Sequence, residues 1–541
     1  MANKYTHEEL NNCSREELIT IVLMMQGQLD ALNENIEKLI EQVRIANSHR
    51  FGRRTETLSS IDGQLSFFNE AEAACDESAP EPEPEDVLPS RRSKKKKGQR
   101  DFNLKDFPEE ILPPYSISEE QLDAFYGKGN WRRMPDETYK RLRHEPESWT
   151  VEVHTVEVYV GTGGDHQDEF IRGERPKDLL RNSIVTPSLL ASILNVKYVN
   201  SSALNRIEQE FKRNGVNISR QTMSNWIVMS ARKYFAPFVE RMKQELLTLH
   251  VTQSDETPTR VISDRGHPNS QCYMWVHRSG ELYRDRPIVI YEYRKCRDHQ
   301  IPLEFYKDYK GILVTDSLQQ YHLVDKKLPD VINANCWAHA RRDFADAVKA
   351  ADKNDPQAVR QSVAYQALQK IAEFYNADTE LKGLPSGERL QKRQEVIRPL
   401  VEEFFAWVKQ KQAECVVPPQ SKTGKGLQFC VNQEKYLKVF LTDGDVPIDN
   451  SASERAIRTF CLGKKNWMFH NTARGADASA LVYSISETAK LNNLRPYNYF
   501  KYILTELPKL CDEKGNIDPA KLDYLMPWSE SLPEECRKPR R

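Results

Sequence analysis

The sequence predicts a multidomain protein of the α+β class, because helical and strand patterns fall in different stretches of the chain. Residues 184–240 repeat apolar positions at helical spacing, whereas residues 248–335 contain the short apolar or alternating runs that are typical of strands. With 541 residues, the chain is long enough for several domains and a large core. We therefore expect a central α/β core that is flanked and interrupted by helical segments.

The composition narrows the class of protein further. No apolar run reaches membrane-spanning length, so no membrane partner is expected, and the N-terminus MANKYTHEEL has no signal-peptide core. The ten cysteines are scattered without a C-x-x-C pair, which predicts a reduced, cytoplasmic protein. The formal net charge of −1 does not indicate a nucleic-acid ligand, which would need a locally basic surface.

An unbroken heptad seam predicts a coiled coil within residues 1–56. The apolar spacings alternate between four and three, with branched side chains at most a positions and Leu at most d positions, which favours a parallel dimer. We therefore expect a homodimer or a higher oligomer; the alternative is an amphipathic helix packed on its own chain. The seam consists of Leu18, Val22, Met25, Leu29, Leu32, Ile36, Leu39 and Val43.

Residues 57–100 are predicted to be a disordered linker with two blocks of opposite charge. Residues 69–87 hold eight acids, no base and three prolines, and residues 91–100 hold seven bases and no acid. The basic block could lie on DNA phosphates or be a solvated tail. Residues 101–180 then predict a small α+β module, since a helical pattern precedes the alternating stretch at residues 148–161.

Residues 181–245 are predicted to form a helix-turn-helix domain. A helix at residues 202–215 ends at Gly215, and Ser219 is a suitable N-cap for a second helix. The alternative is an ordinary αα-hairpin, but seven bases and two acids between residues 197 and 233 favour DNA. The start of a recognition helix reaches base edges. The residues expected there are Arg220, Gln221, Ser224 and Asn225.

Residues 246–345 show the order of elements of an RNase H-like domain. Strand patterns occupy residues 248–255, 271–280, 286–293 and 311–316, with a helix at residues 297–309, and residues 331–344 hold a fifth strand followed by a helix. Residues 346–429 are helical and polar, and look like an insertion before the final helix of the core within residues 430–500. Residues 501–541 are expected to be a C-terminal tail.

Three carboxylates lie at the edges of these elements. Asp255 ends the first strand, Asp316 follows the fourth, and Glu454 starts a later helix. The spacings are 61 (316 − 255) and 138 (454 − 316), and the insertion explains the second. Carboxylates that converge at one end of a sheet can hold Mg²⁺ for attack on a phosphodiester. The expected fold is therefore an RNase H-like α/β catalytic core with a helical insertion, an N-terminal coiled coil and a helix-turn-helix DNA-binding domain.

Each carboxylate also has a structural explanation. Asp255 could open the turn before Pro258, and Asp316 could cap the helix that follows it. Ser451 and Glu454 match the S-x-x-E capping box. The placement of all three on the right elements in the right order favours the catalytic interpretation. The rival carboxylates in these segments are Glu256, Asp264 and, most seriously, Asp449.

Basic side chains near the carboxylates indicate a phosphate substrate, because guanidinium forks fit phosphate oxygens. The alternative is ordinary surface solvation. Cys336 and His339 have the spacing of a metal-binding pair, but no second pair accompanies them, so a structural role is expected for them instead of zinc. The bases expected to contact DNA are Arg341, Arg342, Arg455, Arg458, Lys464 and Lys465.

The chain resembles the transposases of the insertion sequence 66 family, which are DDE-type enzymes. The matching strings run in family order over nearly the whole chain. They are RFGRRTE, SRQTMSNWI, SDETP, VTDSLQQY, CWAHARRDF, DNSASERAIRTFCLGKKNWMFH, SISETAKLNNLRPYNYF and YLMPW.

The resemblance implies that Asp255, Asp316 and Glu454 form an acidic triad that binds Mg²⁺, for which Mn²⁺ could substitute. It also implies binding to terminal inverted repeats, strand cleavage, strand transfer into target DNA, and accessory transposition proteins. Family members commonly carry a cysteine-paired zinc module, but this chain has no cysteine between Cys75 and Cys272. Residues 101–180 therefore stand where a degenerate zinc-binding domain would be, and structural zinc is not expected. The alternatives are an inactive or repurposed DNA-binding relative and a nuclease without strand transfer.

Overall fold

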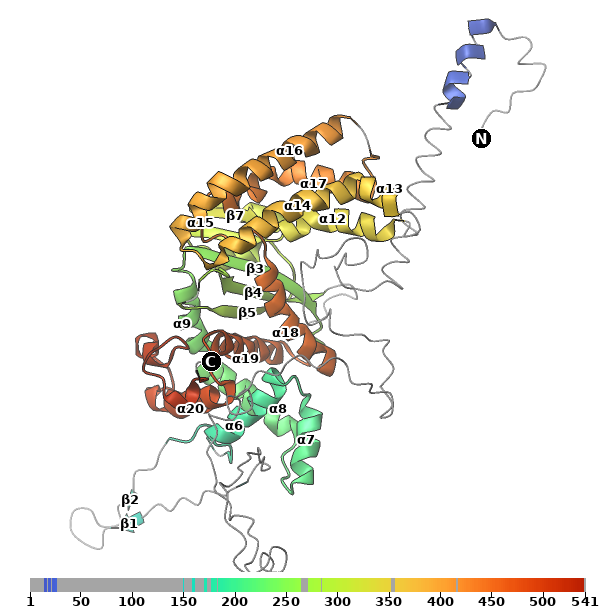
Figure 1. The fold of residues 1–541 in the computed structure, drawn as a ribbon. Helices are drawn as coiled ribbons and strands as arrows, with labels where there is room; N and C mark the ends of the chain where they lie inside the picture. The colour runs from blue at the N-terminus through green and yellow to red at the C-terminus, as the bar shows by residue number, and fades with distance from the viewer. Residues whose placement is uncertain are drawn as a thin grey trace, which may run out of the picture. The chain divides into compact units, whose positions relative to one another are not determined.

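The computed structural model describes residues 177–539, apart from residues 182, 264–270, 284, 352–355 and 415–416, together with Trp149 and short stretches within residues 14–26, 158–160 and 170–172 (Figure 1). The chain divides into two compact units, residues 1–75 with 177–538 and residues 76–176 with 539–541. In the described part, no helix is both long enough and apolar enough to span a membrane.

Several predicted segments lie largely outside the described residues. Within the predicted coiled coil, residues 15–16, 18–20 and 22–26 are helical, and Val22 and Met25 of the heptad seam are exposed. The rest of the seam and the linker at residues 57–100 lie outside the described residues. In the second unit, the stretch predicted as a strand contains β1 (Val158–Val160), which pairs antiparallel with β2 (Phe170–Arg172).

A five-stranded mixed sheet lies at the centre of the first unit, in the order β5-β4-β3-β6-β7. β3, β4 and β5 form an antiparallel meander, and β6 and β7 run parallel to β3. The strands are β3 (Val251–Thr259), β4 (Cys272–Ser279), β5 (Val289–Arg294), β6 (Gly311–Thr315) and β7 (Val331–Asn335). The connecting helices are α10 (Gln300–Phe305), α11 (Gln319–Lys327) and α12 (Trp337–Ala350), so the element order matches the expectation from the sequence.

The first strand of this sheet is longer than predicted. It was expected to end at Asp255, but β3 continues to Thr259 because its antiparallel partner β4 pairs with it as far as Thr259 opposite Cys272. The parallel pairing of β3 with β6 stops earlier, at Gln253 opposite Val314. Asp255 therefore lies just beyond the end of the parallel ladder and not at the end of the strand.

The free edge of β5 is covered by helix α19 (Ala473–Leu491), which runs along it (Figure 1). The backbone N–H of Val289 donates to the Thr488 hydroxyl at 3.0 Å, and that of Tyr291 donates to the Ser484 hydroxyl at 2.8 Å. Side-chain hydroxyls of a helix thus satisfy donors that an edge strand would otherwise present to another chain.

Within residues 183–250, the α-helices that lead to the sheet are α6 (Pro187–Leu194), α7 (Leu204–Arg213), α8 (Arg220–Ser230) and α9 (Ala236–Leu246). α7 ends at Arg213, and Gly215, whose φ is +79°, lies as predicted in the turn that follows. The N–H of Val216 donates to the Phe211 carbonyl at 2.8 Å, which gives a Schellman C-cap. Ser219 is the predicted N-cap of α8, and its hydroxyl accepts from the N–H of Thr222 at 3.1 Å.

The helical insertion lies on the β6–β7 side of the sheet, where it forms its own hydrophobic cluster with α12. It is longer than the predicted residues 346–429, because its last helix continues to residue 437. Its helices are α13 (Pro356–Gln361), α14 (Val363–Glu380), α15 (Ser386–Lys392), α16 (Arg398–Ala413) and α17 (Lys422–Leu437).

The C-terminal region is folded and is not the tail expected at residues 501–541. Helix α20 (Pro496–Leu510) packs against α6, and the segment after it buries Leu525, Met526 and Cys536. Leu525 and Met526 join α6–α9, β4, β5 and α19 in one hydrophobic cluster. Ile503, Leu504 and Leu507 have the spacing of one helix face, whereas the fold of the segment after α20 depends on tertiary contacts that no local pattern indicates.

Candidate active site

Asp255 lies within β3, and Asp316 directly follows β6, the strand that pairs parallel with β3. The pairing of β3 with β6 places Val251 opposite Ile312, an offset of 61 (312 − 251), and keeps this offset as far as Gln253 opposite Val314. The same offset relates Asp255 to Asp316 (316 − 255 = 61). The spacing seen in the sequence is therefore the register of the sheet, and it brings the two carboxylates to one edge.

Glu454 approaches the same edge from a helix. α18 (Ser451–Trp467) carries Glu454 in its first turn and packs across β3 and β4. Burial raises the pKa of Asp255 well above its usual range, and the charge of the adjacent Glu256 raises this pKa further. The charges of Asp316 and Glu454 add to the rise, so the other two predicted carboxylates both act on Asp255.

Asp316 is also perturbed. Burial, followed by the charge of Glu256, raises the pKa of Asp316 to about 7. The N–H of Leu318, which donates to Asp316 Oδ1 at 3.4 Å, and the positive charges of Arg297 and Arg342 oppose this rise. Two neighbouring buried carboxyls with raised pKa values repel each other when both are ionised.

The donor set fits a divalent cation. As the side chains stand, no group of three or more His, Cys, Asp or Glu residues in the described part of the chain is arranged to hold a metal ion. Three carboxylates nevertheless supply the hard oxygen ligands that Mg²⁺ prefers. A cation between them would favour the charged forms of Asp255 and Asp316, which burial and the charge of Glu256 disfavour.

The structural explanations for the three carboxylates are wrong. Asp255 lies inside β3, opposite Val276, and not in a turn. The N-cap of α11 is Leu318 and not Asp316. The capping box does not form, because Ser451 is already the first residue of α18. Its buried hydroxyl has no hydrogen-bond partner among the described residues.

Two of the rival carboxylates, Glu256 and Asp449, form hydrogen bonds with other residues. Glu256 is buried and accepts hydrogen bonds from the Tyr321 hydroxyl at 2.6 Å and from Arg297 Nε at 2.5 Å. Asp449 accepts the N–H of Ser451 at 2.9 Å. Burial raises the pKa of Asp449. Among the charged groups that act on this pKa, Glu281 raises it further and Lys382 lowers it. Asp264 lies outside the described residues.

Asn450, which the sequence analysis did not single out, joins β3 to the start of α18. Its side chain donates to the Ser254 carbonyl at 2.8 Å and accepts from Gln253 Nε2 at 3.1 Å. Its own N–H donates to the Cys336 sulfur at 3.1 Å. Ser254 precedes Asp255, so these buried contacts fix the first and third carboxylates relative to each other. Cys336 thus has a structural contact, in keeping with the role expected for it.

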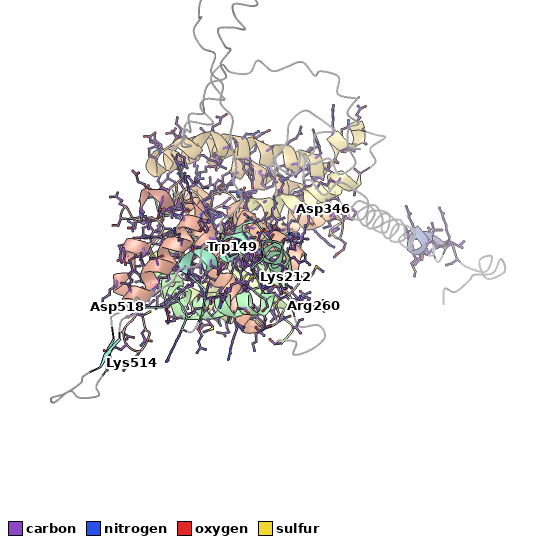
Figure 2. All side chains as sticks on the ribbon, turned by 90° about the horizontal axis from the view of Figure 1, so that it is seen from below. Trp149, Lys212, Arg260, Asp346, Lys514 and Asp518 are labelled. Atoms are coloured by element: carbon purple, nitrogen blue, oxygen red, sulfur yellow. The ribbon has the colours of Figure 1, made fainter. Side chains whose placement is uncertain are left out.

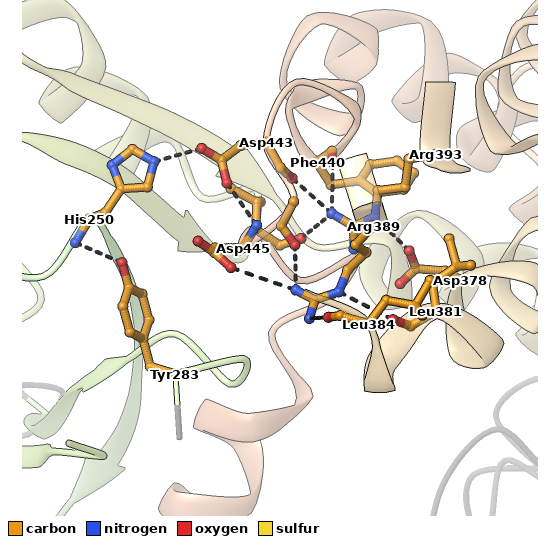
Figure 3. A network of polar contacts seen from close by, with 12 residues as sticks. His250, Tyr283, Asp378, Leu381, Leu384, Arg389, Arg393, Phe440, Asp443 and Asp445 are labelled. Carbon is orange, nitrogen blue, oxygen red and sulfur yellow. Dashed lines mark hydrogen bonds and ion pairs between the residues drawn. The ribbon is translucent and has the colours of Figure 1, made fainter. Parts of the chain in front are cut away.

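The loop that leads into α18 is held by two buried arginines of the insertion (Figure 3). Arg393 donates to Asp378 Oδ1 at 2.7 Å and to the carbonyls of Phe440, Asp443 and Val446 at 2.9, 2.9 and 2.8 Å. Arg389 donates in the same way to the carbonyls of residues 444 and 384, both at 2.6 Å. The insertion therefore sets where α18 begins.

The bases expected to contact DNA divide into exposed and buried residues. Arg341 is only 3% exposed and its charge acts on Tyr375 of α14, so it cannot meet a DNA backbone; that expectation was wrong. Lys464 and Ser224 are half-buried, and Lys464 Nζ donates to the Pro258 carbonyl at 2.7 Å. The exposed members of the set are Arg220, Gln221, Asn225, Arg342, Arg455, Arg458 and Lys465.

Comparison with protein families agrees with this geometry. The family model described as "Transposase IS66 family" matches residues 182–478, more than half of the chain. The chain belongs to the IS66 transposase family. The IS66 C-terminal element matches residues 484–528, which include the folded C-terminal region. A further model, "Transposase C of IS166 homeodomain", matches residues 38–111. Together these matches cover most of the chain, and the DDE family that they indicate uses divalent metal ions.

Relatives of this IS66 transposase occur in Sinorhizobium fredii. Uncharacterized protein y4hP is 26% identical over 352 residues, which are 64% of this chain and 62% of y4hP. Uncharacterized protein y4qI is 25% identical over 514 residues, 92% of this chain and 89% of y4qI. Uncharacterized protein y4jD is 24% identical over 378 residues, 67% of this chain and 70% of y4jD. The chain therefore spans less than two thirds of y4hP but most of y4qI.

Substitution of Arg393 tests whether this side chain stabilises the loop before α18. Arg393→Met should lower the free energy of unfolding by about 3–5 kcal/mol, because it leaves the Asp378 carboxylate buried without its partner. Lys409→Met, which removes an exposed ion pair with Glu434, is the control and should cost less than about 1 kcal/mol. Urea unfolding measures both losses. Equal losses would show that Arg393 does not hold the loop.

The raised pKa of Asp316 predicts a pH-dependent stability of the metal-free protein. The folded chain keeps this proton up to about pH 7, whereas the unfolded chain releases it near the ordinary pKa of 3.8. The stabilising contribution is therefore complete below about pH 4 and is lost as the pH rises towards 7. In a chelator, Asp316→Asn should unfold at a higher temperature than the wild type at pH 8 and at the same temperature at pH 4. Asp330→Asn, in an exposed turn, should follow the wild type; the prediction fails if Asp316→Asn does too.

Proposed function

We propose that this IS66-family chain is a DDE transposase that binds the terminal inverted repeats of an insertion sequence and catalyses metal-dependent strand cleavage and strand transfer. The observation that carries the proposal is the shared register of Asp255 and Asp316, with Glu454 close enough to raise the pKa of Asp255. The sheet order β5-β4-β3-β6-β7, with β4 antiparallel to β3, supports an RNase H-like catalytic core.

In this proposal Asp255, Asp316 and Glu454 hold Mg²⁺, for which Mn²⁺ could substitute. When bound, the ions stabilise charge on the attacking and leaving oxygens of a phosphodiester. Asp255 and Asp316 must lose their protons to serve as ligands, so their raised pKa values make binding pH-dependent. Arg342 is exposed, and its positive charge lowers the pKa of Asp316. Its guanidinium group could bind a phosphate oxygen of the bound strand.

The reaction consists of two displacements at phosphorus. Water attacks the phosphodiester at the end of the element, so that the bond to the 3′ oxygen breaks and a 3′-hydroxyl is freed. This hydroxyl then attacks a phosphodiester of the target DNA and displaces another 3′ oxygen. No covalent protein intermediate is needed, because the attacking groups are water and the DNA end itself.

DNA recognition is assigned to the helix-turn-helix formed by α7 and α8. Arg220, Gln221 and Asn225 are exposed near the start of α8, where a recognition helix meets base edges, and Ser224 lies beside them. Gln221 and Asn225 share a hydrogen bond of 3.5 Å and could read adjacent bases together. The predicted coiled coil would join two or more protomers on the paired DNA ends, together with accessory transposition proteins, in the cytoplasm.

The catalytic assignment is tested by Asp316→Asn. Cleavage of a duplex that carries the element's own end should fall about 1,000-fold, because several kcal/mol of transition-state stabilisation by the metal are lost. End binding, measured by mobility shift, should be unchanged. Asp330→Asn is the matched control and should cleave normally. Near-normal cleavage by Asp316→Asn would exclude the assignment. A wild type that binds ends without any cleavage would indicate a repurposed binder, and cleavage without joining would indicate a nuclease.

The third carboxylate is tested by comparing Glu454→Gln with Asp449→Asn. Glu454→Gln should lose cleavage as completely as Asp316→Asn, because an amide is a poor replacement for a charged ligand. Asp449→Asn should lose much less, because the amide oxygen can still accept the N–H of Ser451. Initial cleavage rates in Mn²⁺ measure both effects. The reverse order of losses would move the third ligand to Asp449.

A further inference from the structure

Helix α18 ends in a strained turn that exposes two large apolar side chains. Met468, its C-cap, has φ +67° and ψ −40°, and the N–H of Phe469 donates to the Trp467 carbonyl at 2.8 Å. This is a γ-turn with positive φ, a conformation that is rare and costly for a residue with a side chain. Such strain persists only where the surroundings enforce it, and it is concentrated at functional sites.

The residues on both sides of this turn are anchored. The Trp467 ring lies 3.9 Å from the Lys197 ammonium, which is itself buried. His470 is 7% exposed, and its N–H donates to the carbonyl of Arg260 at 2.9 Å. Arg260 is exposed just beyond β3 (Figure 2). Met468 and Phe469 are here called the apolar tip. Because the residues on both sides of them are held by these contacts, the two side chains remain 67% and 39% exposed.

An exposed stripe of α18 connects the catalytic end of the helix to the apolar tip. Arg455, Arg458, Leu462 and Lys465 follow each other at intervals of three, four and three residues, so they share one face of the helix, and all four are exposed. From Glu454 to the end of the helix at Trp467 there are 13 residues (467 − 454), which span about 20 Å at 1.5 Å per residue.

The segment of chain that carries the apolar tip is basic. Residues 455–476 contain five lysines and arginines and no acid, although Arg455 forms an ion pair with Glu281. Large apolar side chains on a basic segment suit DNA, since the bases bind phosphates while apolar side chains stack on or wedge between nucleobases. A protein partner would need an acidic rim around an apolar pocket to match this surface.

We propose that the apolar tip inserts between bases of the bound DNA while the exposed stripe of α18 holds its phosphates. At about 3.4 Å per base pair, 20 Å corresponds to about six base pairs, so the distortion lies about six base pairs from the cleaved phosphate. The inference rests on the proposed function, because the active site at the start of α18 is what orients the DNA along this helix. It adds a DNA-distorting role for Met468 and Phe469, which the sequence analysis did not consider.

The test uses 2-aminopurine, whose fluorescence rises when it is unstacked, placed at successive positions of the element's end duplex. The full chain with Asp316→Asn binds the duplex without cutting it. Fluorescence should rise on binding at positions about six base pairs from the cleavage site. In the same chain, Met468→Ala with Phe469→Ala should abolish this rise and weaken binding about tenfold. Phe469→Trp alone should keep the rise.

The control replaces two other exposed apolar residues, Ile332 and Val396, with alanine in the same chain, and should change neither the fluorescence nor the binding. Thermal unfolding checks that each variant is folded. End binding and cleavage by the wild type without any fluorescence rise would overturn this inference and leave the proposed function intact. A tip variant that changes the oligomeric state but not the fluorescence would also overturn it, in favour of a protein contact. A wild type that neither binds nor cuts ends would overturn both.

Discussion

The parallel pairing of β3 with β6 is the constraint on which the rest of the site depends. It places Asp255 and Asp316 at the same level of adjacent strands, although they are 61 residues apart. Because side chains alternate between the faces of a sheet, a slip of one residue would separate the two carboxylates. The antiparallel partner β4 extends β3 beyond this point and so keeps Asp255 inside a rigid strand.

This arrangement costs stability in the absence of a cation, and the protein supports it with buried polar contacts. Burial, followed by the charge of Glu256, raises the pKa values of both Asp255 and Asp316. A hydrogen bond from Asn450 to Ser254 connects the start of α18 to β3, and a hydrogen bond from Arg393 to Val446 connects the loop before α18 to the insertion. The insertion therefore acts as a support for the third carboxylate as well as an added domain. A site under such strain is what a metal-dependent enzyme needs, because the ligands must stand ready before the ion arrives.

The surfaces assigned to DNA lie on elements that the same core holds in place. The hydrophobic cluster of α6–α9 also contains α19, α20 and strands β4 and β5, so the helices proposed to read DNA share a core with the central sheet. α18 links the two proposed functions, since it begins with Glu454 and ends next to Lys197 of the region proposed to bind DNA. The C-terminal region completes this cluster instead of trailing from it.

The sequence by itself determined the local features of this protein: the order of strands and helices, the turn at Gly215, the cap at Ser219 and the spacing of two carboxylates. These depend on residues close together in the chain or on a pattern that repeats along it. The tertiary structure decided which charged groups are available. It buried Arg341 and brought the charge of Glu454 close to Asp255, 199 residues away along the chain (454 − 255), and no local pattern in the sequence records such burial or such long-range neighbours.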